Sequence, residues 1–388
     1  MSQCIHCLDD IKHPMGQVID DSGLCTGCLT HKEKDHIDWS EKWVQLEEKC
    51  QNILKKSKGK YDCIVPLNAD AEDYYIVENV LKLNLRPLLV YVNNYFGTDL
   101  SWRNLHNLET HFDLDLIVFN PNIVEYKEAV RTSLRKFNSI YWPYQAIKTA
   151  YPVRLALEMK TPLIIWGGFQ ATEQTGKFSH HDMVEMTGWS RIQHDLFCVD
   201  EKDFFGSGAQ ISERNQYHYT YPPIQQAKKV TGIYLSNYMK WDPWLQNKSI
   251  IKYGFKPENS VQTFDQYERA GSSVFYQIHD ILRYKKYGYI KVRDQLSREI
   301  RHGRISKSSA VNVYHYYLNK DVNIESFFKW LEVTESGYKL FCNTRLNFLK
   351  DKFNDGRSLV TVEGEFSSSF FEKGLPISKE FITYYKGI

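Results

Sequence analysis

The stretch Tyr61-Asp-Cys-Ile-Val-Pro-Leu-Asn-Ala-Asp-Ala-Glu-Asp-Tyr74 decides the fold of this chain. Its apolar run at residues 63–67 is typical of a strand buried on both faces, and a helical pattern follows. The turn between them carries three carboxylates, those of Asp70, Glu72 and Asp73. Such carboxylates either cap the N-terminus of a helix or bind magnesium, and the pattern alone leaves both interpretations open.

The same alternation of apolar runs and amphipathic stretches continues along the chain. Strands are expected at 63–67, 87–92, 115–119 and 162–166, and helices at 74–83, 102–110, 124–137 and 146–159. Buried strands that alternate with helices predict an α/β fold, with a parallel sheet covered by helices on both faces. The ligand site of such a sheet lies at the carboxyl ends of its strands. We therefore expect the site among residues 67–73, 93–98 and 167–175.

Two cysteine pairs stand near the N-terminus, Cys4-Ile-His-Cys7 and Cys25-Thr-Gly-Cys28. Their spacing predicts a zinc ribbon, in which four thiolates complete a closed structural site. The alternative is two disulfides in a secreted protein, but no apolar signal segment precedes Cys4, so we expect a cytoplasmic protein. Because four cysteines satisfy the metal, we expect His6 and His31 to be surface residues.

Composition and length give the remaining organisation. The chain has 49 Lys and Arg against 47 Asp and Glu, so it lacks the basic excess that would predict nucleic-acid binding. It also contains no apolar run of about 18 residues, so no membrane span is expected. The expected domains are a zinc ribbon at 1–35, a connector helix at 36–60, an α/β domain at 61–240 and a mostly helical C-terminal domain at 241–388.

Several short motifs carry a resemblance to a known family over residues 1–335. They are the two cysteine pairs, His36-Ile-Asp-Trp39, Tyr61-Asp-Cys-Ile-Val-Pro66, Pro162-Leu-Ile-Ile-Trp-Gly167, Gly232-Ile-Tyr-Leu235 with Trp241-Asp242, Tyr253-Gly-Phe255, Ile278-His-Asp280, Lys286-Tyr-Gly288 and Glu299-Ile-Arg-His-Gly-Arg-Ile-Ser306. In order and spacing the chain resembles the N-acetyl sugar amidotransferases of bacterial surface-polysaccharide and flagellar-glycan pathways. The resemblance implies a PP-loop, HUP-like α/β fold.

The resemblance also implies a reaction. Such enzymes activate a sugar N-acetyl group with ATP and displace the activated oxygen with ammonia, which gives an acetamidino sugar. A partner glutaminase and synthase pair supplies the ammonia. In the PP-loop ATP pyrophosphatases, the turn after the first strand reads Ser-Gly-Gly-Lys-Asp-Ser, and its N–H groups and lysine hold phosphate. The corresponding residues 68–73 of this chain lack both glycines and the lysine, which speaks against ATP with magnesium as a cofactor.

Other family positions are altered as well. A Glu-Asn-Ile-Asp-Cys-like segment is reduced to Glu268, and the run Gly-Tyr-Gly-Arg-Ala-Thr-Asp reads Gly288-Tyr-Ile-Lys-Val-Arg-Asp294. The loop that follows the fourth expected strand is altered too. The candidate cofactor-binding residues are Asn68, Asp70, Glu72, Asp73, Gly167 and Gly168.

Four polar residues of the C-terminal region are candidate substrate ligands. His279 and Asp280 can form an acid–base pair or a structural polar pair. Arg301 and Arg304 can bind a sugar-nucleotide phosphate, or they can mark a helix that ends at Gly303. A metal site at His180-His-Asp182 is disfavoured, because adjacent histidines seldom point to one centre.

Two functions remain open from the sequence. The first is a divergent N-acetyl sugar amidotransferase-like protein of surface-glycan biosynthesis that acts on an N-acetyl sugar or nucleotide sugar. The second is a catalytically inactive homologue that serves as a scaffold or regulator of the pathway. No catalytic residue can be assigned from the motifs. A weaker third option is another PP-loop ligase or a tRNA-modifying protein, which the nearly balanced charge disfavours.

Overall fold

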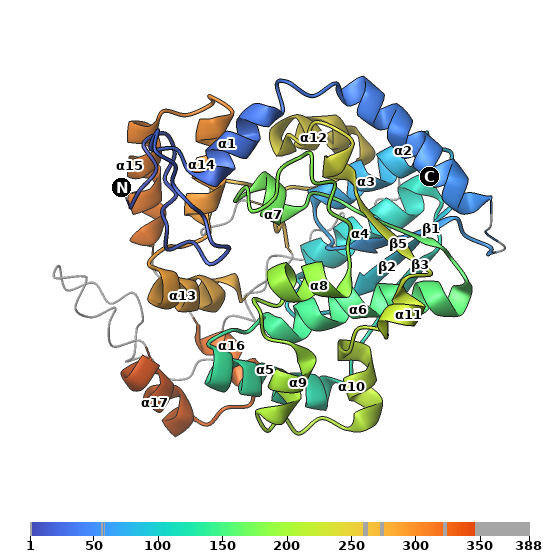
Figure 1. The fold of residues 1–388 in the computed structure, drawn as a ribbon. Coiled ribbons are helices and arrows are strands. Elements are labelled where there is room, and N and C mark those ends of the chain that lie inside the picture. The colour runs from blue at the N-terminus through green and yellow to red at the C-terminus, as the bar shows by residue number, and fades with distance from the viewer. Residues whose placement is uncertain are drawn as a thin grey trace.

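A five-stranded parallel sheet, with strand order β3-β2-β1-β4-β5, forms the centre of the molecule (Figure 1). The computed structural model describes residues 2–345 except 56, 58, 259–262, 272–274 and 321–323. The strands are β1 (Cys63–Leu67), β2 (Pro87–Val92), β3 (Leu116–Phe119), β4 (Leu163–Trp166) and β5 (Thr231–Tyr234). Every residue of β1, β2 and β4 is buried, as a parallel sheet covered on both faces requires.

Helices cover the two faces of the sheet. On one face, Val65 packs in a common core with side chains of α3 (Ala71–Lys82) and α4 (Asp99–Phe112). On the other face, Ile64 packs with side chains of α6 (Trp142–Met159), and α5 (Ile123–Phe137) packs against α6. Successive strand residues thus point to opposite cores, and the sheet is the middle layer of three.

The other helices surround this centre. They are α1 (Thr26–Glu33), α2 (Trp39–Leu54), α7 (Gln170–Glu173), α8 (Gly188–Ser190), α9 (Glu201–Gly206), α10 (Glu213–Tyr219), α11 (Ile224–Ala227), α12 (Pro243–Ile250), α13 (Tyr276–Tyr287), α14 (Val292–Arg301), α15 (Lys307–Leu318), α16 (Glu325–Trp330) and α17 (Glu335–Arg345). A short π-helix (Arg191–Asp195) and two 3-10 turns (Leu235–Asn237 and Ile251–Tyr253) complete the elements. Within the described part of the chain, no helix is both long and apolar enough to cross a bilayer.

The N-terminal ribbon packs against helices from the far end of the sequence. The four cysteines and Leu8 share one hydrophobic cluster with Val292, Leu296 and Ile300 of α14 and with Ala310 of α15. Figure 1 shows the N-terminal loops beside α14 and α15, on the side of the molecule away from the sheet. The ribbon therefore packs on the C-terminal helices and does not stand apart from them.

The α/β class, the parallel sheet, the cysteine cluster and the helical C-terminal region confirm the fold expected from the sequence. Two strands, β1 and β2, have the expected bounds. The fifth strand was not expected, because its four residues include a glycine and give almost no periodic signal. Helix α3 begins at Ala71, earlier than expected, because Asp70 serves as its N-cap residue.

Candidate functional site

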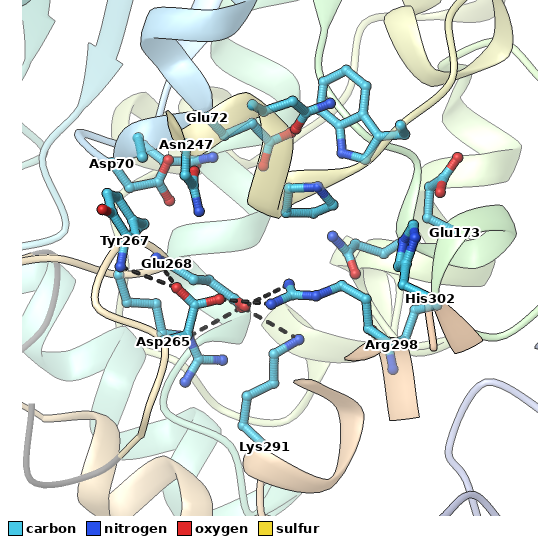
Figure 2. Close-up of a pocket in the computed structure, with 18 of the residues that line it drawn as sticks. Asp70, Glu72, Glu173, Asn247, Asp265, Tyr267, Glu268, Lys291, Arg298 and His302 are labelled. Carbon is cyan, nitrogen blue, oxygen red and sulfur yellow. Dashed lines mark hydrogen bonds and ion pairs between the residues drawn. The ribbon is translucent and has the colours of Figure 1, made fainter. Parts of the chain in front are cut away.

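The candidate site lies where the strand order of the sheet reverses. From β1 the chain adds β2 and β3 on one side, whereas β4 lies on the other side, so the loops after β1 and β4 diverge between these two strands. A cavity of about 250 Å³ opens there (Figure 2). Asn68, Asn94 and Gln170 are among its lining residues, so all three expected loops contribute to its wall. We call it the switch-point cavity.

The loop after β1 folds back onto a carboxylate of its own helix. The side chain of Asp73, fully buried beneath the loop, accepts hydrogen bonds from the N–H groups of Asn68 at 2.9 Å, Ala69 at 2.6 Å and Asp70 at 3.2 Å. Ala69 has a φ of 64°, the left-handed conformation that a glycine adopts at little cost. The N–H groups of residues 68–70 therefore converge although this loop has no glycine, because Ala69 itself adopts the left-handed conformation.

The other carboxylates of the loop point elsewhere. Oε1 of Glu72 accepts a hydrogen bond of 2.7 Å from the N–H group of Gly168, which joins the loops after β1 and β4. Burial raises the pKa of Glu72 above its usual range, although this bond opposes the shift. Burial and the neighbouring Asp73 and Glu72 raise the pKa of Asp70 well above its usual range. These arrangements match a helix-start acidic cluster, since its carboxylates do not converge on one point.

Gly167 and Gly168 permit this close approach. A Cβ atom at Gly167 would lie 2.0 Å from Oε1 of Glu72, and one at Gly168 would lie 2.7 Å from Nε1 of Trp241. Neither glycine is among the residues that line the switch-point cavity. The two glycines therefore shape the wall by letting side chains rest on the backbone, and they do not present their own N–H groups to the cavity.

The opposite wall was missed by the sequence reasoning. Glu268 lies 3.4 Å from Arg298 and 3.5 Å from Lys291, and Arg298 also pairs with Asp265 at 2.7 Å (Figure 2). Burial opposes ionisation of Glu268, but the neighbouring Lys291, Arg269 and Arg298 lower its pKa below the usual range. The available signal was that Glu268 is kept in an altered family segment, and that Lys291 stands where the resemblance has arginine.

Charges in the switch-point cavity balance. Five carboxylates face five Lys or Arg side chains, and burial lowers the pKa values of its two histidines, His31 and His302, to about 3, so both are neutral. The carboxylates belong to Asp70, Glu72, Glu173, Asp265 and Glu268, and the cations to Lys34, Arg269, Lys291, Arg298 and Arg301. By count of acidic and basic side chains, the cavity therefore has no excess of cations to hold a triphosphate.

A second, larger cavity adjoins the first. Its volume is about 550 Å³, and it shares part of its wall with the switch-point cavity. The shared residues are Tyr141, Gln170, Gln174, Arg269, Tyr276 and Lys291. The remaining wall comes from α13, α14, the segment around His13, the start of α6 and the segment around Leu196. We call it the aromatic cavity, because tyrosines, a tryptophan and phenylalanines line much of it.

The aromatic cavity differs from its neighbour in charge. Five cations (Lys136, Arg269, Arg283, Lys286 and Lys291) line it against two carboxylates (Asp195 and Asp294). Nε2 of His13 lies 3.4 Å from Asp294, and Nη1 of Arg283 lies 3.7 Å from the same carboxylate. Nδ1 of His194 is a buried atom of this wall that has no hydrogen-bond partner among the described residues. Buried polar atoms are normally satisfied, so this nitrogen is available to a ligand. The aromatic cavity thus offers polar atoms and a positive excess to a ligand.

The predicted substrate residues His279 and Asp280 do not act on one cavity. His279 lines the aromatic cavity, where its ring meets Tyr141 edge-on at 4.6 Å and its Nε2 lies 3.0 Å from Nη2 of Arg283. Asp280 faces a small adjacent cavity and accepts a hydrogen bond of 3.2 Å from the N–H of Lys291. Because the two neighbours on α13 point in different directions, the arrangement disfavours an acid–base pair.

Arg301 and Arg304 also have partners within the protein. Arg301 lies 2.5 Å from Asp9 and donates to the carbonyl of Gln174, next to the cysteine cluster. Arg304 contacts Glu299 at 2.5 Å and Asp242 at 3.0 Å, and it does not line either cavity. Gly303, with a φ of 69°, follows the end of α14, so the helix-end interpretation fits this segment.

The four cysteines form the candidate metal centre. Sγ of Cys4 lies 3.8 Å from Sγ of Cys28, and Sγ of Cys7 lies 3.5 Å from Sγ of Cys25. A tetrahedral zinc site with Zn–S bonds of about 2.3 Å places its sulfur atoms roughly 3.8 Å apart, so the cluster fits zinc. These separations exceed a disulfide bond of about 2.05 Å, and the disulfide alternative is therefore wrong.

Charged groups surround the cysteine cluster. Nη2 of Arg301 lies 3.7 Å from Sγ of Cys7 and 3.6 Å from Sγ of Cys25, and Asp9 balances the guanidinium. Among the residues that the structure describes, Cys4, Cys7, Cys25 and Cys28 are the only group of three or more potential metal ligands close enough to share one ion. Magnesium binding by Asp70, Glu72 and Asp73 thus finds no support.

Two histidines, His31 and His180, lie in positions that the sequence did not predict. His31 is not a surface residue, since it lines the switch-point cavity and its ring meets that of His302 at 4.5 Å. His180 is 1% exposed, and its ring meets Trp39 edge-on at 5.7 Å. Burial lowers the pKa of His180 to about 3, so its imidazole is neutral. Its role is packing beneath α2, which the sequence could not reveal because that contact is long-range.

These features define an α/β protein with an N-terminal four-cysteine ribbon and adjoining cavities at the switch point of its sheet. Residues 258–355, about a quarter of the chain, match a family model described as "LPS biosynthesis protein WbpG-like, C-terminal domain". The match supports a role in lipopolysaccharide or other surface-glycan biosynthesis. The matched segment includes α13 and α14, which form one wall of the aromatic cavity.

A curated relative is also similar over part of the chain. The "Uncharacterized protein MJ1599" of Methanocaldococcus jannaschii is 25% identical over 114 residues, which cover 28% of this chain and 39% of that protein. The chain thus spans about two fifths of the length of this relative. The name of this relative states no activity.

Proposed function

We propose that the chain is a divergent N-acetyl sugar amidotransferase-like protein of surface-glycan biosynthesis, which binds an N-acetylated nucleotide sugar in the aromatic cavity. The observation that carries the proposal is the make-up of that cavity. Its volume of about 550 Å³ lies within the usual range of small-molecule pockets. Its positive excess fits the phosphates of a nucleotide sugar, and its aromatic rings fit a sugar or base.

The matched segment supports this assignment. Arg269, Tyr276 and Lys291 lie in the segment that resembles the glycan-biosynthesis domain, and all three line both cavities. The guanidinium of Arg269 rests 3.3 Å above the ring of Tyr276, and this pair forms part of the shared wall. A ligand in the aromatic cavity would therefore extend toward Glu268 and the loop after β1 through this wall.

Binding of UDP- and CMP-sugars, with and without an N-acetyl group, tests the proposal by isothermal titration calorimetry. We expect the wild type to bind at least one N-acetylated member, and to bind its non-acetylated counterpart more weakly. Lys286→Gln should weaken binding about fivefold, because an exposed cation near a phosphate contributes about 1 kcal/mol. The matched control is Lys285→Gln, which changes the neighbouring residue of α13 outside the cavity wall. No binding by the wild type, or equal losses in both variants, would contradict the proposal.

The second candidate is the complete family reaction, ATP-dependent amidation with ammonia from a glutaminase and synthase pair. Retention of Glu268 with a positive charge at Lys291 favours it, and the balanced charge of the switch-point cavity disfavours it. Purified protein with ATP, magnesium, ammonium and the sugar panel should release no pyrophosphate beyond background. Sugar-dependent release would establish the second candidate in place of a binding-only role.

A further inference from the structure

The N-terminus of α3 already holds an anion from its own chain. Both carboxylate oxygens of Asp73 accept hydrogen bonds, Oδ1 from Asn68 at 3.0 Å and Oδ2 from Asn68, Ala69 and Asp70 at 2.6–3.2 Å. Consecutive N–H groups around a left-handed residue form a concave anion-binding nest, here at the positive end of a 12-residue helix. The carboxylate of Asp73 occupies this nest and accepts hydrogen bonds from three successive N–H groups.

This arrangement goes beyond an ordinary helix cap. In a capping box, the carboxylate at the third helical position receives one N–H group, that of the N-cap residue. Asp73 receives that group from Asp70 and two more from the preceding residues, which belong to the loop after β1. The cap at Asp38 provides a contrast, because one oxygen of Asp38 accepts from Ser40 and Glu41, both inside α2.

We propose that Asp73 is a specificity-determining residue, an internal anion that occupies the phosphate position of this loop and makes the switch-point cavity reject phosphate groups. A ligand phosphate would have to displace this buried carboxylate from the N–H groups of the nest, and the two anions would repel each other at a few ångströms. The inference does not depend on which sugar the aromatic cavity binds, because Asp73 and the loop at 68–70 are not part of that cavity's wall.

The internal anion also determines what the cavity can accept. With the nest closed, the loop presents Asn68, Asp70 and Glu72 to the cavity, and Oδ1 of Asp70 is a buried atom without a hydrogen bond inside the described chain. The amide of Asn68 and the carboxyl of Asp70 can both donate and accept hydrogen bonds, so this wall suits ligand hydroxyl groups, which do the same. A neutral part of a sugar fits this wall, whereas a phosphate does not.

Pyrophosphate binding tests the inference on the full-length protein by isothermal titration calorimetry at pH 8. Pyrophosphate binding by the wild type at the switch-point cavity should be too weak to saturate, and Asp73→Ser should bind at least about tenfold more tightly than the upper limit set by the wild type, since one buried like charge is removed. Because the aromatic cavity can bind pyrophosphate too, each titration is repeated in a Lys286→Gln background. The gain caused by Asp73→Ser should persist in that background.

Two further variants keep the test decisive. Asp38→Ser removes a helix-capping aspartate of α2 that is remote from both cavities, and it should gain no pyrophosphate binding. If Asp73→Ser does not fold, Asp73→Asn retains an acceptor for the N–H groups while losing the charge. It should also increase the affinity for pyrophosphate, but by less than Asp73→Ser. Unchanged pyrophosphate binding in a folded Asp73 variant, or an equal gain in Asp38→Ser, would overturn the inference. Failure of sugar binding would leave it intact and would refute only the proposed function.

Discussion

Some single residues of this molecule are important because neighbouring atoms leave no space for a larger side chain. Gly167 is the sharpest case, because a Cβ atom there would meet Oε1 of Glu72 at 2.0 Å and Cδ1 of Ile76 at 2.8 Å. We expect Gly167→Ala to destabilise the protein by about 1–3 kcal/mol, since α3 would have to move from β4. Chemical denaturation measures the loss. Gly206→Ala, with no atom within 4 Å of its added Cβ, is the matched control and should change stability far less.

A buried histidine gives the protein a defined response to acid. Burial lowers the pKa of His180 to about 3, whereas the unfolded side chain titrates near 6.5. The unfolded state therefore binds a proton first, and stability falls as pH decreases from about 6.5 toward 3. His180→Phe should flatten this loss, which has a limiting slope of about 1.4 kcal/mol per pH unit. Tm followed against pH for the wild type and for His180→Phe measures this difference.

Elements show how far the sequence could predict the structure. The bounds of β1 and β2 were predicted to the residue, because an apolar run of five or six residues between turns is too short for a buried helix and is typical of a buried strand. The expected loops did meet in one cavity, since topology alone brings carboxyl ends together. The partners of Glu268 and the destination of Arg301 could not be predicted. They depend on long-range packing of α14 against the ribbon and the loop at 265–269, which leaves no periodic signal.

The cysteine ribbon should behave as one element whose stability depends on metal. We expect Cys25→Ser to lower zinc content and Tm together, because three remaining thiolates bind zinc much more weakly than four. Metal content by atomic emission spectrometry and thermal unfolding on the same sample measure both effects. Cys198→Ser, at an exposed cysteine outside the cluster, is the control. An unchanged metal-to-protein ratio in Cys25→Ser would contradict the assignment.

At the scale of the whole molecule, Arg301 connects the cysteine cluster to the cavities. Arg301 contacts Cys7 and Cys25 at one end of its guanidinium and the carbonyl of Gln174 at the other, and Gln174 lines both cavities. α14 also carries Leu296 and Ile300, which pack on the cysteines. The ribbon therefore supports a wall of the candidate site from behind.

Removal of zinc should consequently loosen this wall before the sheet unfolds. Hydrogen–deuterium exchange of the protein with and without a chelator should show faster exchange in α14 and α15, with β1 and β2 unchanged. Sugar binding should weaken in parallel if the aromatic cavity is the binding site. Equal acceleration in all elements would indicate global unfolding and contradict a local bracing role.

The packing of the ribbon on α14 and α15 has a consequence for how the protein is made. The four cysteines emerge from the ribosome before Val292–Arg301, which is synthesised more than 260 residues later. At about 5–20 residues per second, the ribbon waits roughly 15–50 s for its packing partners. During translation it can capture zinc early, yet its apolar face stays open to solvent and to chaperones. This wall of the site is thus added to a cysteine ribbon that was synthesised well before it.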